Sequence, residues 1–186
     1  NGTLEYSQRI DYEYEGKRLL RESYDTSNDG SVETVYTYTY TDKNGSYDKV
    51  ITNDGDADGI PESIITEKHV LDRKGNLISL TTLSDYDANG SIDYGTSTEY
   101  TCDKQGRITE EVYTADEFWD GTPDYVQTLN TTYGKDGVSR REFIMDYNGG
   151  NDYRWVIDNT YNKGLLKSVV TSWDFDLDGT IDQTDT

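Results

Sequence analysis

The feature that most constrains the fold is a repeat of about 30 residues that runs through the chain. One series of segments is acidic, with glycine at its sixth position. Gly30, Gly59, Gly90 and Gly121 are separated by 29, 31 and 31 residues, and Gly179 follows 58 residues after Gly121. A second series of turns lies midway between the acidic segments, with glycines at Gly16, Gly45, Gly75, Gly106, Gly137 and Gly164. Each repeat therefore contains two different turns.

The segments between the turns have the periodicity of β-strands. They are runs of about 8 to 10 residues rich in Tyr, Thr, Val and Ile, the residues that favour strands. In 32–41, for example, Tyr36, Tyr38 and Tyr40 alternate with threonines. We therefore expect an all-β fold, an up-and-down antiparallel meander of about twelve strands. The sheet is either open or curled and barrel-like, with the acidic loops along one edge and the tight turns along the other.

The whole chain, 1–186, is expected to form a single repeat domain of about six repeats, or one segment of a longer array. The run 3–14 reads as a strand with no acidic segment before it, and only four residues follow 174–182. These two ends are complementary halves of one repeat. Three explanations fit: an excised array, a sheet closed into a barrel, or subunits that polymerise head to tail. We favour an array segment or a self-associating subunit.

The acidic segments have the spacing of a calcium loop. The segment 54–62 reads D-G-D-A-D-G-I-P-E, with oxygen-bearing side chains at positions 1, 3, 5 and 9 and glycine at position 6. Calcium takes six to eight oxygen ligands, and the glycine permits the sharp bend that brings them together. We predict about three to four calcium ions. The predicted ligands are Asp54, Asp56, Asp58 and Glu62; Asp85, Asp87, Asn89 and Asp93; Asp174, Asp176, Asp178 and Asp182; and Asp25, Ser27, Asp29 and Glu33.

Two further acidic segments depart from this pattern. Phe118 replaces the third oxygen-bearing side chain in 116–124, and 146–152 is two residues shorter and has lost the position of the glycine. These departures count against a site in either segment, most of all in 146–152, and neither is included among the predicted ligands. The alternative interpretation of every acidic segment is an ordinary solvated turn. That interpretation explains the residue types but not their fixed order.

Both kinds of turn resemble known repeats. The D-x-D-x-D-G-x-x-D segments, such as 174–182, resemble the calcium hairpin loops of integrin-type FG-GAP repeats; this resemblance covers the loops alone and implies calcium binding but no propeller. The turns 72–77 and 103–108, with nearby tyrosines, resemble the YD repeats of bacterial RHS and wall-associated proteins. That resemblance spans most of the chain and implies a long array of hairpins.

The formal net charge of −20 excludes some partners. A charge of this sign and size repels nucleic acid and anionic membrane surfaces, and it favours cations. Cys102 is the single cysteine, so no internal disulfide is expected, and the apolar runs are too short for membrane insertion. Calcium modules that bind at about 10⁻⁴–10⁻³ M function outside cells. We therefore expect an extracellular or cell-surface location, in a bacterium.

These features predict a secreted, calcium-stabilised β-repeat protein with a structural or adhesive role, as a stalk, matrix component or filament subunit. Its expected partners are neighbouring repeats or further copies of itself, joined head to tail or through edge strands. The alternative is a carbohydrate-binding module that uses Trp119, Trp155 or Trp173 to stack on glycans. His69 is the only histidine and no catalytic motif is found, so we expect no enzyme.

Overall fold

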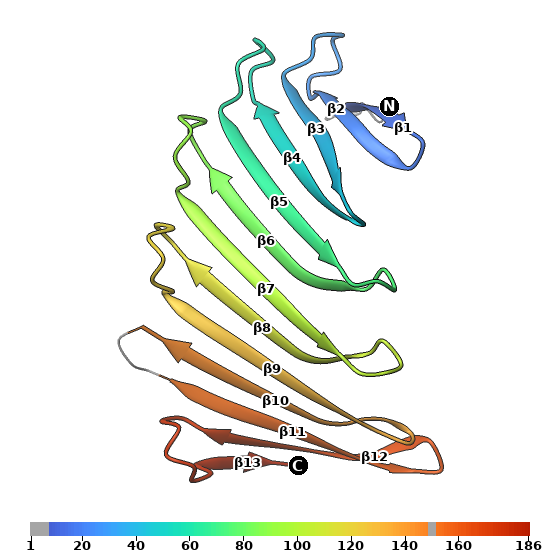
Figure 1. The fold of residues 1–186 in the computed structure, drawn as a ribbon, viewed down its shortest axis with the longest axis vertical. Helices are drawn as coiled ribbons and strands as arrows, with labels where there is room; N and C mark the ends of the chain where they lie inside the picture. The colour runs from blue at the N-terminus through green and yellow to red at the C-terminus, as the bar shows by residue number, and fades with distance from the viewer. Residues whose placement is uncertain (1–7, 149–151) are drawn as a thin grey trace, which may run out of the picture.

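The computed structural model describes residues 8–148 and 152–186. These residues form 13 strands in one antiparallel sheet, in which the spatial order of the strands is their order in the sequence (Figure 1). The predicted all-β meander is confirmed. The strands are β1 (Arg9–Glu15), β2 (Arg18–Asp25), β3 (Thr34–Lys43), β4 (Ser46–Asp54), β5 (Ser63–Leu71), β6 (Leu77–Asp85), β7 (Tyr94–Cys102), β8 (Ile108–Asp116), β9 (Tyr125–Gly134), β10 (Gly137–Tyr147), β11 (Tyr153–Asn162), β12 (Leu165–Asp174) and β13 (Gln183–Asp185).

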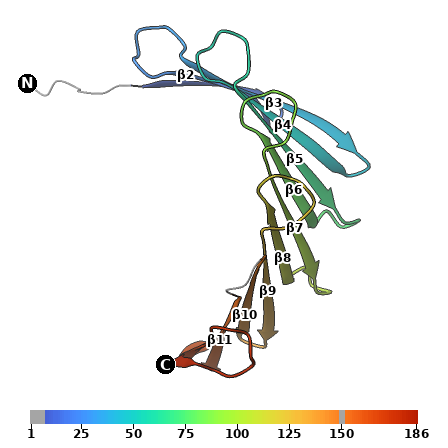
Figure 2. The same cartoon turned by 90° about the vertical axis from the view of Figure 1, so that its left-hand side faces the viewer.

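The sheet bends into an open arc and does not close into a barrel (Figure 2). Of the two forms that the sequence allowed, the barrel-like sheet is therefore wrong and the open sheet is confirmed. Closure requires hydrogen bonds between the first and last strands. In the described part of the chain, β1 pairs with β2 alone and β13 pairs with β12 alone, so the first and last strands are the two edges of the sheet.

The two series of turns lie at opposite ends of the strands, as the repeat predicts (Figure 1). At one end, β3 and β4 are joined by the two-residue turn Asn44–Gly45, with φ angles of 49° and 89°. Asn-Gly is favoured there because both residues of such a turn need positive φ. At the other end lie the nine-residue acidic loops, among them the one that links β4 to β5.

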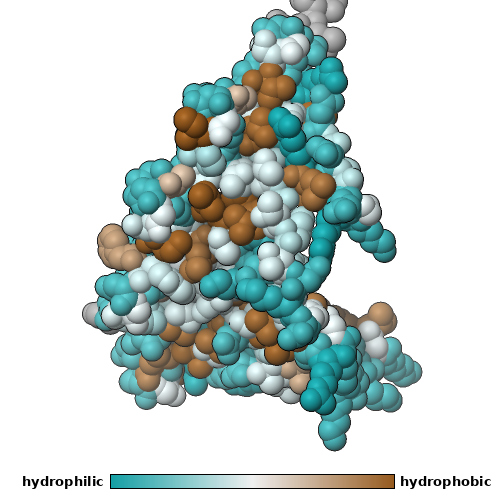
Figure 3. All heavy atoms as spheres, turned by 45° about the horizontal axis from the view of Figure 1, so that its top comes forward, coloured by the Kyte–Doolittle hydropathy of each residue, from teal (hydrophilic) through white to brown (hydrophobic). Residues whose placement is uncertain are grey.

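The sheet is a single layer with little core. The buried apolar side chains among the described residues are Val35, Leu83, Ala115, Met145 and Val156. Most domains bury a sheet face against a second layer, and here the described residues form one layer only. In the view of Figure 3 the apolar residues form separate patches in a mostly hydrophilic surface. The stability of the fold must therefore depend on hydrogen bonds between strands, on contacts between neighbouring side chains, and on the interactions that keep the acidic loops folded.

One face of the sheet is aromatic. In β3, Tyr36, Tyr38 and Tyr40 are partly buried, whereas Thr37 and Thr39 between them are exposed, so the predicted alternation is confirmed. Aromatic side chains on neighbouring strands stack across this face. The ring centroids of Phe143 and Trp155 are 4.3 Å apart with 7° between the planes, and those of Tyr147 and Tyr153 are 6.3 Å apart with 28° between the planes. Such pairs stabilise a sheet beyond the area that they bury.

Candidate metal sites

The acidic loops share one pattern of hydrogen bonds, which begins at the aspartate in position 1. In the loop 54–62, Asp54 accepts hydrogen bonds from the backbone N–H groups of Asp58, at 3.0 Å, and Gly59, at 2.9 Å. The first aspartates of 25–33, 85–93 and 116–124 accept the same two bonds, at 2.7 to 3.1 Å. The first carboxylate thus curls its own loop into a ring.

The acidic residue at position 9 closes this ring. The backbone N–H of Glu62 donates to the carbonyl of Asn53 at 2.8 Å, and the Glu62 carboxylate accepts a hydrogen bond from the backbone N–H of Gly55. The equivalent carboxylates of Asp93 and Asp182 accept from the residue at position 2, each at 2.7 Å. Position 9 therefore brings the end of each loop back to its start.

Two backbone positions in these loops are left-handed. The glycine at position 6 has a positive φ, for example 93° at Gly59, where a side chain would be strained. Position 4 is also left-handed although it is not glycine, with φ of 59° at Ala57, 53° at Ala88 and 56° at Leu177. The sequence pattern predicts the first of these and does not reveal the second.

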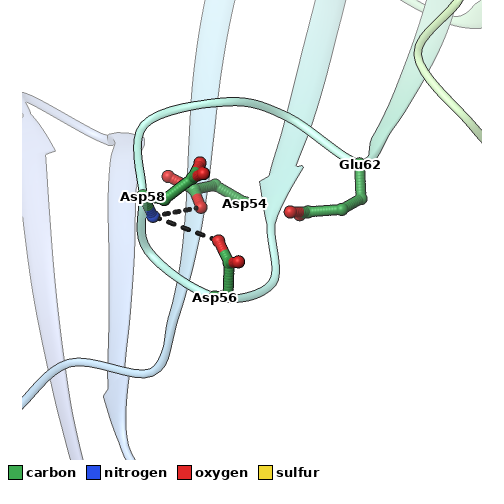
Figure 4. Close-up of side chains that lie close together, drawn as sticks. All are labelled: Asp54, Asp56, Asp58 and Glu62. Carbon is green, nitrogen blue, oxygen red and sulfur yellow. Dashed lines mark hydrogen bonds between the residues drawn. The ribbon is translucent and has the colours of Figure 1, made fainter.

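In four loops this folding brings carboxylates together. Asp54, Asp56, Asp58 and Glu62 each offer an oxygen, and these oxygens lie within 4.8 Å of one another. Figure 4 shows the four side chains converging toward the inside of the loop. The same spacing holds for three more groups among the described residues: Asp25, Asp29 and Glu33; Asp85, Asp87 and Asp93; and Asp174, Asp176 and Asp182.

Some predicted ligands lie at the margin of these groups. Asp178 is outside its group, and its carboxylate accepts a hydrogen bond from the backbone N–H of Thr180 at 2.6 Å. The Asn89 side chain donates to Asp87 at 2.9 Å, and the Ser27 hydroxyl donates to Glu33 at 2.9 Å. Asn89 and Ser27 therefore contact the acidic groups through hydrogen bonds.

Asp174 is the most unusual carboxylate of these loops. Its side chain is 1% exposed, and its Oδ1 is buried without a hydrogen-bond partner. Its Oδ2 accepts one bond, from the backbone N–H of Gly179 at 3.2 Å. A buried carboxylate with a free oxygen is costly unless a cation or a hydrogen-bond donor compensates it.

The fourth loop, 116–124, has the same hydrogen-bonded backbone ring, but aromatic side chains, Phe118 and Trp119, stand at its positions 3 and 4. Asp116 and Asp120 keep their hydrogen bonds, and Trp119 stands at the left-handed position 4 with φ of 49°. The Trp119 ring covers Gly95 so closely that a Cβ at Gly95 would lie 1.9 Å from the Cε3 of Trp119. The sequence gives no sign of this contact because the two residues are distant in the chain.

The fifth acidic segment, 146–152, lies partly outside the described residues, because residues 149–151 are not described. Its last residue, Asp152, accepts a hydrogen bond from the backbone N–H of Tyr147 at 2.9 Å. This bond resembles the one made by position 9 in the longer loops.

The net charge of the chain is located in the acidic loops. The six acidic segments hold 20 of the 37 Asp and Glu residues and none of the 17 Lys and Arg residues. The remaining 17 acidic residues are matched by the 17 basic ones, which leaves the strands and tight turns neutral as a group. Counter-ions are therefore attracted to the loop edge.

Comparison with protein families and with curated proteins adds no relative. No protein-family model matches the chain, and no curated protein matches it at a significant level. Across residues 8–148 and 152–186, no helix is long and apolar enough to cross a membrane. Functional inference therefore depends on the geometry of the acidic loops.

Proposed function

We propose that this is a secreted or cell-surface bacterial protein, a calcium-stabilised β-repeat with a structural or adhesive role. The observation that carries the proposal is the buried, unpaired oxygen of Asp174 beside Asp176 and Asp182. A bound cation would satisfy that oxygen and offset the repulsion among the three carboxylates. In the loops of the other three groups, the first aspartate also accepts a hydrogen bond from the glycine at position 6, which extends the argument to those groups.

Calcium is the cation that suits these donors best. The four groups consist of carboxylates, with no histidine or cysteine, and oxygen donors favour magnesium, calcium or manganese over zinc or copper. Magnesium requires a near-ideal octahedron and retains its water, whereas calcium accepts many oxygens in irregular geometry. A nine-residue loop that converges several carboxylates on one point fits calcium.

Bound ions would make a large contribution to the stability of this fold. If free calcium is about ten times the dissociation constant, one site adds about 1.4 kcal/mol to the free energy of unfolding. Four sites would then add about 6 kcal/mol, which is comparable with the whole stability of many domains. A single-layer sheet with few buried apolar side chains needs such a contribution.

The shape and the edges of the sheet support the proposal of a structural or adhesive role. The strand β13 pairs with Thr171, Ser172 and Trp173 of β12, and the first part of β12 exposes Leu165, at 75%, and Leu166, at 55%. Exposed strand edges of this kind accept further strands. We infer that neighbouring repeats or another copy of the chain cover this edge.

One observation favours the carbohydrate-binding alternative. A groove of about 390 Å³ between two acidic loops is lined by Tyr86 and Phe118, which are 59% and 75% exposed, together with Asp93 and Glu117. Exposed aromatic rings beside carboxylates are suited to sugars. The tryptophans support this alternative less well, because Trp119 covers Gly95 and Trp155 stacks on Phe143. Binding to a glycan array that is lost in Phe118→Ala would favour it.

Thermal unfolding tests the proposal. Melting followed by circular dichroism is compared in about 2 mM calcium, in the same concentration of magnesium, and in excess EDTA. The proposal predicts a melting temperature many degrees higher in calcium than in EDTA, and a smaller rise in magnesium. Equal melting temperatures in calcium and EDTA would mean that the acidic loops are ordinary turns. Light scattering on the same samples would report self-association.

A further inference from the structure

The loop 174–182 differs from the other acidic loops in the residue that stands opposite its first aspartate. In the strand register, Val35 lies opposite Asp54 and Ile64 lies opposite Asp85, so these carboxylates face apolar neighbours. The residue opposite Asp174 is Arg154. A positive charge is thus placed on the same face of the sheet as the first candidate metal ligand.

Arg154 approaches Asp174 without forming a full hydrogen bond to it. Its Nη2 is 3.8 Å from Asp174 Oδ2, and its Nη1 is 3.6 Å from Glu142 Oε1. The Nε of Arg154 is buried and has no partner. The guanidinium therefore lies between two carboxylates, at a distance that leaves Asp174 free to accept another ligand.

This arrangement is particular to the last loop. Arg9 stands opposite Asp25 in the register, but its guanidinium binds Asp11 at 2.9 Å and is 63% exposed. Among the described residues, Arg154 makes the one ion pair that reaches a carboxylate of an acidic loop. The loops 54–62 and 85–93 thus serve as natural comparisons, since no arginine or lysine forms an ion pair with their carboxylates in the part of the chain that the structure describes.

We propose that Arg154 is a built-in counter-ion that sets the calcium affinity of the loop 174–182. Without a metal ion, its charge stabilises the buried Asp174. With one, the same charge repels the ion, which would be bound among the oxygens of Asp174, Asp176 and Asp182. The repulsion is strong because Asp174 is 1% exposed and water screens it little. This inference rests on the proposed function, since it concerns an ion in the same loops.

The test is a calcium titration by calorimetry of the wild type and of Arg154→Val, which recreates the pairing of Val35 with Asp54. We expect one site to bind calcium about tenfold more tightly in this variant, because a full charge is removed from a weakly screened position. We also expect a lower melting temperature in EDTA. Arg154→Lys, which keeps the charge, should retain an affinity close to that of the wild type.

The matched control is Arg140→Val, which removes a positive charge from the same face of the sheet but leaves the loop untouched. Arg140 pairs with Asp158 at 3.2 Å and is 45% exposed, and its contact with Glu142, the carboxylate that Arg154 also approaches, is long at 3.9 Å. Its removal should therefore change no calcium affinity by more than about twofold. If Arg154→Val does not fold in EDTA, Arg154→Gln, which retains much of the side chain's volume and hydrogen bonding, replaces it in the titration.

The outcomes separate this inference from the proposed function. One outcome is that the wild type binds calcium but the neutral variants of Arg154 bind it with the same or a weaker affinity. This result would overturn the role of Arg154 and would not contradict calcium binding by the loops. A wild type that binds no calcium would overturn both. Tighter binding in Arg140→Val as well would show a general effect of net charge, and would also overturn the specific role of Arg154.

Discussion

Asp174 and Asp116 are a matched pair of residues at position 1 of two acidic loops. Both are buried, at 1% and 6% exposure, but Asp174 belongs to a convergent acidic group, whereas 116–124 has Phe118 at position 3. We predict that Asp174→Asn lowers the stabilisation by calcium by about 1.4 kcal/mol, the contribution of one site at ten times its dissociation constant. Asp116→Asn should leave that stabilisation unchanged.

Urea unfolding with and without calcium measures both effects. In EDTA, Asp174→Asn should change the stability little, because the loss of an incompletely paired buried charge is offset by the loss of its attraction to Arg154. An equal loss of calcium response in the two variants would contradict the distinction between the loops.

Gly95 and Trp119 form a close contact between β7 and the loop 116–124. Because a Cβ at Gly95 would meet the Trp119 ring at 1.9 Å, Gly95→Val should destabilise the fold by about 1–3 kcal/mol, the usual cost of overpacking. In the background of Trp119→Ala, the same valine should cost much less, since the ring is gone. A double-mutant cycle in urea checks this coupling. Additive effects would show that the ring does not depend on Gly95 for its place.

At the scale of single elements, the left-handed position 4 of the acidic loops carries strain. Ala57, with φ of 59°, occupies a conformation that costs an L-residue about 1 kcal/mol. Ala57→Gly should therefore raise the free energy of unfolding by up to about 1 kcal/mol. The control is Ala115→Gly in β8, where the alanine is fully buried and the change should destabilise. Destabilisation by both substitutions, measured as urea midpoints, would contradict the account of the loop.

The tight turns give the fold a dependence on pH. The backbone N–H of Asn76, with help from its side chain, lowers the pKa of Asp72 below its ordinary value of 3.8, and the Arg18 guanidinium lowers the pKa of Asp42. A lowered pKa means that the folded state binds a proton less readily than the unfolded state. The stabilisation is therefore complete above pH 3.8 and is lost as the pH falls below it.

We predict that the urea midpoint of the calcium-free protein falls as the pH is lowered from about 5 to about 3. Removal of calcium before the titration, by EDTA at neutral pH followed by dialysis, separates this effect from the loss of metal binding. Asp72→Asn keeps an acceptor oxygen but cannot be protonated in this range, so its midpoint should depend less on pH. A variant with the full pH dependence of the wild type would show that Asp72 does not contribute.

At the scale of single elements, the sequence could predict local structure, meaning the strands and the bends of the loops. Alternation in 32–41 predicted the strand, and the glycine at position 6 predicted the bend of each acidic loop, because both depend on neighbours in the chain. The pairing of Trp119 with Gly95, and of Arg154 with Asp174, depends on the register between strands. Register is a property of the assembled sheet, so a local pattern could not reveal these contacts.

For the molecule as a whole, the central features are one open layer of strands and a loop edge that carries the net charge. The meander was predictable because every repeat contains two short turns, which leave antiparallel neighbours as the simple solution. Whether the sheet closes was not predictable, since closure depends on the accumulated twist of many strands. An open sheet with its charge on one edge is the form that bound cations would stabilise most.

The most direct test of the central claim is the number of calcium ions that the protein binds at equilibrium, measured by dialysis against radioactive calcium. The four convergent carboxylate groups predict about four ions per chain, with affinities in the range of about 10⁻⁴–10⁻³ M. Asp116→Asn should bind the same number and Asp174→Asn one fewer. Binding of no calcium at millimolar concentrations would contradict the claim that these loops are metal sites.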